Sequence, residues 1–132
     1  MIKIYDNIPK NSLYVFLERA KELLNVSSFH LIFLPYRYTN SQVKEIVSIS
    51  NSRERHIQYM FEENESGFVF KNTIVYIASE WNQEMQLRLL KDLYRVKMWN
   101  EQTHVSEGDV NAIVKYIYNH YFMREQNIQI SA

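Results

Sequence analysis

The fold is decided by one stretch, Asn72-Thr73-Ile74-Val75-Tyr76-Ile77-Ala78, and by the segment that follows it. Residues 73–78 are β-branched or aromatic apart from the final alanine, which predicts a buried strand. Residues 82–99 then predict a long helix, because apolar side chains recur every three or four positions: Met85, Leu89, Leu90, Leu93 and Val96. After a polar turn, the same spacing between Val110 and Phe122 predicts a final helix.

The chain before residue 72 predicts a helix and further strands. Residues 2–5 suit a short strand, and an apolar stripe predicts a helix that starts at Asn11 or Ser12 and ends near Leu24. The β-preferring run 29–34, which stops at Pro35, predicts a second strand.

The middle of the chain is less regular. Residues 41–47 suit a short helix, residues 47–49 also suit a strand, and 48–52 are polar enough for a loop, so the structure of 37–55 stays open. Residues 56–61 alternate between apolar and polar, and with 68–70 they predict a hairpin that leads into the strand at 73–78.

These elements predict one small α+β domain over residues 1–132, with an N-terminal helix, a small twisted sheet containing a hairpin, and two C-terminal helices. The polar residues 125–132 are expected to form a frayed tail. The chain has 132 residues, of which 46% are hydrophobic and only two are glycine and two proline. Such a composition is typical of a single ordered core rather than a disordered chain.

Charge and cysteine content exclude several classes of protein. Fifteen basic and fifteen acidic residues cancel, so bulk charge does not favour a protein that coats nucleic acid or an anionic membrane. There is no cysteine, which excludes disulfides, thiolate zinc sites and a cysteine nucleophile. The N-terminus lacks the apolar core of a signal peptide, and no apolar run could cross a bilayer. We therefore expect a cytoplasmic protein without membrane contact.

The order of elements resembles the ImmA/IrrE-type zinc metallopeptidases, in which a strand is followed by a helix carrying H-E-x-x-H and a later helix brings an acidic third ligand. The resemblance covers roughly residues 56–122. Residues 66–68 and 72–76 are similar to the glycine-phenylalanine hairpin and the strand of that family. The run from Glu107 to Val114 is similar to its E-x-x-A-N-x-F-A segment, which implies that Glu107 keeps the position of the third ligand.

The metal-binding motif itself is absent. Residues 91–95 read Lys-Asp-Leu-Tyr-Arg where the family has H-E-L-G-H, and neither Lys91 nor Arg95 can bind a divalent cation, since both are cationic near neutral pH. Asp92 is expected to form ion pairs with Arg88 and Arg95 on a solvated helix face. The sequence thus predicts a zincin-like domain with no catalytic residues, no metal and no cofactor.

Residues spaced three and four apart on the main helix form the best candidate site: Arg88, Lys91, Arg95 and Trp99. Arginine forks and an indole suit an acidic protein segment or a phosphate. The resemblance implies an inactive relative that binds and blocks a regulator or host protein, as a factor of a phage or mobile element. Two alternatives stay open: a solvated face with Trp99 folded onto the core, and a nucleic-acid surface in which Tyr94 and Trp99 stack on bases.

Other features are weaker. His104 and Glu107 lie three residues apart and could in principle share a metal, although an isolated pair of this kind is more often a capping arrangement at the start of a helix. Most of the circumference of that helix is aromatic or apolar, which hints at a partner or a dimer contact. An enzyme built from separated residues is carried as a third possibility, which no motif supports.

Overall fold

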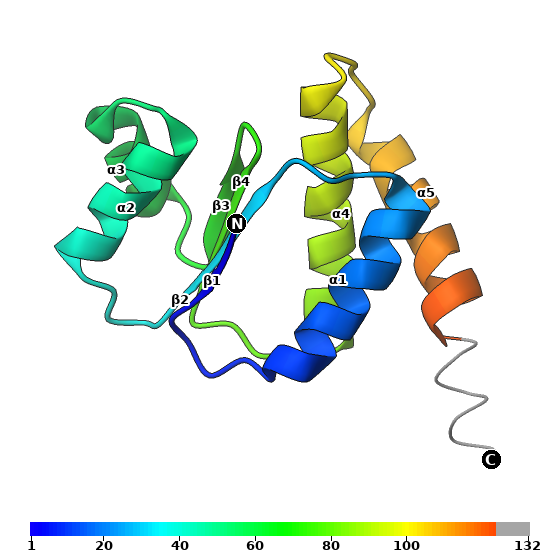
Figure 1. Ribbon diagram of the computed structural model, residues 1–132. Coiled ribbons are helices and arrows are strands. Elements are labelled where there is room, and N and C mark those ends of the chain that lie inside the picture. Colours follow the sequence, from blue (N-terminus) through cyan, green and yellow to red (C-terminus); the bar gives the residue numbers. More distant parts are fainter. Residues whose placement is uncertain (124–132) are drawn as a thin grey trace.

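The computed structural model describes residues 1–123, so the tail predicted at 125–132 lies outside the described residues. In chain order the elements are β1 (Ile2–Ile4), α1 (Lys10–Leu24), β2 (His30–Leu34), α2 (Asn40–Ser50), α3 (Glu54–Glu63), β3 (Gly67–Phe70), β4 (Thr73–Ile77), α4 (Gln83–Asn100), α5 (Glu107–Ile117) and the π-helical turn η1 (Tyr118–Phe122). They form a small α+β domain in which a mixed sheet lies between two groups of helices (Figure 1). Within residues 1–123, no helix is both long enough and apolar enough to cross a membrane.

The sheet has the strand order β1-β2-β4-β3. Strands β1, β2 and β4 are parallel, and β3 runs antiparallel to β4. Helix α1 makes the connection between β1 and β2, as parallel neighbours require. The turn between β3 and β4 has only two residues, and Lys71 adopts a φ of 56° there. The hairpin predicted between 56–61 and 68–70 is therefore wrong: 68–70 does belong to a strand, but that strand pairs with 73–77.

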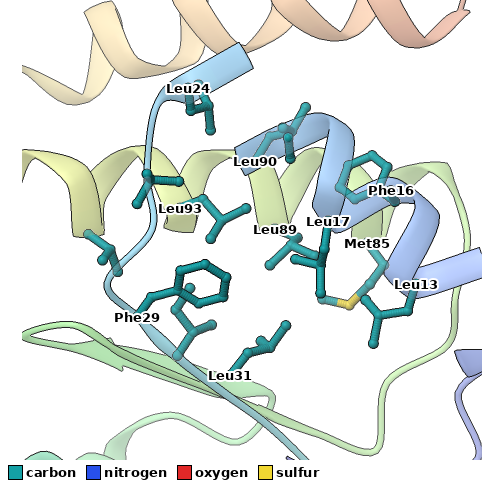
Figure 2. Close-up of a cluster of buried hydrophobic side chains, with 14 of the residues drawn as sticks. Leu13, Phe16, Leu17, Leu24, Phe29, Leu31, Met85, Leu89, Leu90 and Leu93 are labelled. Atoms are coloured by element: carbon teal, nitrogen blue, oxygen red, sulfur yellow. The ribbon is translucent and has the colours of Figure 1, made fainter. Parts of the chain in front are cut away.

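The central strands are buried on both faces, which explains why their sequences are apolar without interruption. Leu31, Phe33, Ile74 and Tyr76 face the larger core, which α1, α4 and α5 cover. Figure 2 shows how the leucines of α1 and α4 meet Phe29 and Leu31 of the β2 segment in this core. The alternate residues of β2 and β4 face a smaller core under α2 and α3.

The strand predicted at 56–61 is wrong, because these residues belong to α3. Ile57 and Phe61 are one helical turn apart, and both are buried against the second face of the sheet. Tyr59 would lie on the same side of a strand, but it is 59% exposed on the helix. The second face of the sheet needs a helical cover, and this tertiary requirement overrides the local alternation.

The open segment 37–55 is mostly helical. Helix α2 extends from Asn40 to Ser50. Of the alternatives left open, the helix at 41–47 is present, residues 47–49 continue it instead of forming a strand, and the loop starts only after Ser50. Thr39 and Gln42 form a capping box at its start, and Asn51 ends it with a left-handed backbone at φ 50°.

Candidate partner-binding site on helix α4

Helix α4 carries the candidate site and is firmly held by the core. Its start is capped by Asn82, whose side chain accepts a hydrogen bond of 2.9 Å from the backbone N–H of Met85. All five apolar residues predicted for its buried stripe are buried: Met85, Leu89, Leu90, Leu93 and Val96. Because α1, α5 and the sheet pack around this helix, side chains on its remaining face are presented on a rigid support.

Asp92 is not on a solvated face, which corrects the prediction. Its residue is only 4% exposed, and it lies beneath the helix against β4. The fully buried Tyr76 donates a hydrogen bond of 2.5 Å from its hydroxyl to Asp92 Oδ2. Arg95 Nη1 donates to Asp92 Oδ1 at 2.5 Å, and Arg88 Nε lies 4.0 Å from Oδ2. The predicted ion pairs are therefore present, but they surround a buried carboxylate.

Burial is the main influence on the pKa values of Asp92 and Tyr76. Removal from water raises the pKa of Asp92, while the hydroxyl of Tyr76 and the guanidinium groups of Arg95 and Arg88 act in the opposite direction. Burial also raises the pKa of Tyr76 well above its usual value, and the neighbouring carboxylate adds to that rise. Tyr76 consequently keeps its proton and remains a hydrogen-bond donor.

Arg95 connects Asp92 to helix α5. Its Nε donates to Glu107 Oε1 at 3.1 Å and its Nη2 donates to Glu107 Oε2 at 2.6 Å, so the pair is bidentate. The hydrogen bond from Arg95 lowers the pKa of Glu107, and the same contact raises the pKa of Arg95. All three nitrogens of the Arg95 guanidinium thus have carboxylate partners within the chain.

Arg88 is also engaged internally. Its Nη1 donates to the backbone carbonyl of Ser66 at 3.3 Å, and its guanidinium lies over the ring of Tyr76 at 4.8 Å from the centroid. These contacts tie α4 to the turn that precedes β3. Two of the four residues predicted for partner binding therefore have internal roles as well.

Trp99 and Lys91 remain available on the surface. Trp99 is 56% exposed near the end of α4, so its indole is not folded onto the core. Lys91 is half-buried and close enough to Glu107 to help lower the pKa of that carboxyl. The structure places all four predicted residues on one helix, with Glu107 of α5 beside Arg95. Sequence reasoning missed Tyr76, whose only signal was its alternation with Ile74 on the strand.

Metal binding receives no structural support within residues 1–123, where no group of three or more histidine, aspartate or glutamate side chains is arranged to hold an ion. Of the pair considered in the sequence, Glu107 faces Arg95 and His104 is exposed in the preceding turn.

Two hollows lie on the surface of the described residues, and the smaller one borders the polar network. The larger, of about 720 Å³, runs along α1 and is bordered by Val15, Phe16, Trp81 and Phe122. The smaller, of about 190 Å³, lies where β4 ends and α4 begins, and Arg88 forms part of its wall. Neither hollow was predicted, because both are made by residues far apart in the sequence.

Comparisons with known proteins do not assign this site. No protein-family model matches the chain, and searches of the curated proteins and of the solved structures gave no match.

Proposed function

We propose that this chain is a catalytically inactive, zincin-like protein-binding domain that acts on a regulator or host protein by occupying it rather than by cutting it. The binding surface is the exposed side of α4, with Trp99 as the apolar anchor and Lys91 and Arg95 as its cationic part. The observation that carries the proposal is a tryptophan, 56% exposed, on a helix that the core holds rigidly. Exposed tryptophans beside arginines are the residue types that dominate binding energy at protein interfaces.

The arrangement around Arg95 supports the inactive character of the domain. In the resemblance to ImmA/IrrE-type metallopeptidases, a metal would lie among the side chains at positions 91, 95 and 107. Here the guanidinium of Arg95 lies between the carboxylates of Asp92 and Glu107. On this resemblance, a positively charged group of the chain itself would take the place of the cation, and its hydrogen bonds join the two helices.

A protein partner is favoured over nucleic acid by the local charge balance. Arg88 and Arg95 both face the buried carboxylate of Asp92, so the charge of these two cations is partly neutralised within the chain. A nucleic-acid surface needs several cations free to neutralise phosphates.

The test is capture of partners from a cell lysate with the immobilised full chain, in parallel with two variants. Trp99→Ser should lose the specific partner, and Tyr36→Ser should keep it, because Tyr36 is also a largely exposed aromatic residue but lies in the loop after β2. The captured protein is then purified and titrated by calorimetry, where Trp99→Ser is expected to weaken binding about 30-fold, as for an interface hot spot. Equal binding by Trp99→Ser and the unmodified chain contradicts the proposal.

A further inference from the structure

We propose that Arg95 is a receptor for a carboxylate of the partner, and that Glu107 fills this receptor in the free protein as an internal competitor. The inference depends on the proposed function, since it names the chemistry that the α4 surface recognises. It assigns the partner an acidic residue with an apolar neighbour, and it gives Glu107 a regulatory role.

The inner side of Arg95 is fixed in place. Nη1 is held at 2.5 Å by the buried carboxylate of Asp92, which Tyr76 holds in turn. The guanidinium therefore cannot rotate freely, and its other edge, made of Nε and Nη2, faces outward in a constant orientation. That edge has the geometry that binds a carboxylate through two parallel hydrogen bonds.

The outer side is filled by a group that is easy to displace. Glu107 reaches Arg95 from the first turn of α5, and its side chain is 69% exposed, compared with 35% for Arg95. Although the pair is bidentate, the exposed position of Glu107 lets water screen most of its attraction to Arg95. A carboxylate from a partner can therefore replace Glu107 at Arg95 with a loss of only about two- to fivefold in affinity.

The neighbouring residues define what accompanies the carboxylate. Trp99 follows Arg95 by one helical turn, which is a rise of about 6 Å along α4. In an extended peptide, alternate side chains lie about 7 Å apart on the same side. A glutamate followed two positions later by phenylalanine can thus contact Arg95 and the exposed indole together, and Lys91 adds positive charge beside the carboxylate.

The probe for the test is acetyl-Glu-Ser-Phe-amide, titrated into the full isotope-labelled chain and followed by NMR at the Nε–Hε group of Arg95 and the indole N–H of Trp99. Acetyl-Gln-Ser-Phe-amide is the matched control peptide. Glu107→Gln removes the negative charge that competes for Arg95 and leaves one neutral amide oxygen as a weaker acceptor, so it should tighten binding of the glutamate peptide by about two- to fivefold, with shifts at both reporter groups. The glutamine peptide should show no gain.

Asp109→Asn is the matched control variant, because it removes one negative charge from the same helical turn without contacting Arg95. It should leave the affinity unchanged. An equal gain in Asp109→Asn and Glu107→Gln overturns the inference in favour of general electrostatics. The inference is also overturned if the glutamate peptide causes no chemical-shift change at Arg95 Nε–Hε in Glu107→Gln. This measurement keeps Arg95 in place, so it does not require that a variant lacking Arg95 folds.

The two proposals can fail separately. If the glutamate peptide behaves as expected but no protein partner depends on Trp99, only the proposed function is lost. If a partner depends on Trp99 while Glu107→Gln changes neither its affinity nor that of the peptide, the competitor role of Glu107 is refuted.

Discussion

Replacement of Tyr76 by phenylalanine tests the polar network beneath α4. The change removes only the hydroxyl that donates to Asp92 Oδ2 at 2.5 Å, in a residue with no exposed surface. Asp92 then keeps its contact with Arg95 but loses its buried donor. A hydrogen bond to a charged group contributes about 1.5–3 kcal/mol, so Tyr76→Phe should lower the free energy of unfolding by that amount. For a domain of this size the melting temperature should fall by about 5–15 °C.

The sign of the effect should depend on Asp92. In an Asp92→Leu background the carboxylate is gone, and the hydroxyl of Tyr76 becomes a buried donor without its acceptor. Tyr76→Phe should then be neutral or should stabilise the protein by up to about 1 kcal/mol, because it removes an unsatisfied polar group. Asp92→Leu alone is expected to destabilise, since it leaves Tyr76 and Arg95 without their shared partner.

The assay is urea unfolding of all four proteins followed by circular dichroism, with the coupling energy taken from the double-mutant cycle. Tyr38→Phe is the control, because Tyr38 packs on Phe61 at a ring distance of 4.9 Å in the other core, and its change should stay within about 0.5 kcal/mol. A Tyr76→Phe effect of less than about 0.5 kcal/mol, or the same effect in both backgrounds, would refute the reasoning.

Three further predictions concern the backbone, pH and metal content. Gly67→Ala should destabilise by more than about 2 kcal/mol, measured by urea unfolding, because φ is 120° there and a Cβ would lie 2.1 Å from the carbonyl oxygen of Val75. Gly108→Ala is the control, because a Cβ there would make only an ordinary contact of 3.9 Å with Ser106 Oγ. Burial lowers the pKa of His30 in the folded state, so its contribution to the free energy of unfolding should be complete above the unfolded pKa of about 6.5 and should fall as the pH drops below that value. His30→Gln should lose this part of the pH dependence, whereas the control variant His56→Gln, at an exposed position, should keep it. Native mass spectrometry of protein purified without chelators should give the mass of the chain alone, and one zinc per chain would contradict the inactive-domain proposal.

The helices and strands with strong periodicity could be predicted from the sequence, and those decided by tertiary packing could not. The stripe from Met85 to Val96 matches a helix and no other structure, so α4 was predicted to within a residue or two. Residues 56–61 fit both periods, because Ile57 and Phe61 lie on one side of a strand and also one turn apart on a helix. The helix is selected because the second face of the sheet needs a cover of buried side chains. This requirement arises from the tertiary structure and cannot be read from the local sequence pattern.

In the candidate site, too, the features set by local spacing could be predicted and those set by tertiary packing could not. The alignment of Arg88, Lys91, Arg95 and Trp99 on one helix follows from spacing alone, and so do the ion pairs of Asp92. The burial of Asp92 cannot be predicted from spacing, because a polar residue between two arginines on a helix has the sequence pattern of a solvated position. Its depth is set by Tyr76, which comes from β4, sixteen residues earlier in the chain. Contacts of this kind depend on how the helix lies on the sheet.

The position of β4 in the sheet has a consequence for synthesis of the chain. Strand β4 lies between β2 and β3, so β2 pairs on one side with β1, made before it, and on the other with a strand made long after it. While α2, α3 and β3 are being translated, the β4-facing edge of β2 has no partner, and its apolar side chains lack part of their cover. Pairing of strands so distant in sequence is slow, and unpaired edges invite association with other chains. The emergence of residues 73–77 from the ribosome is thus the step that ends this vulnerable period.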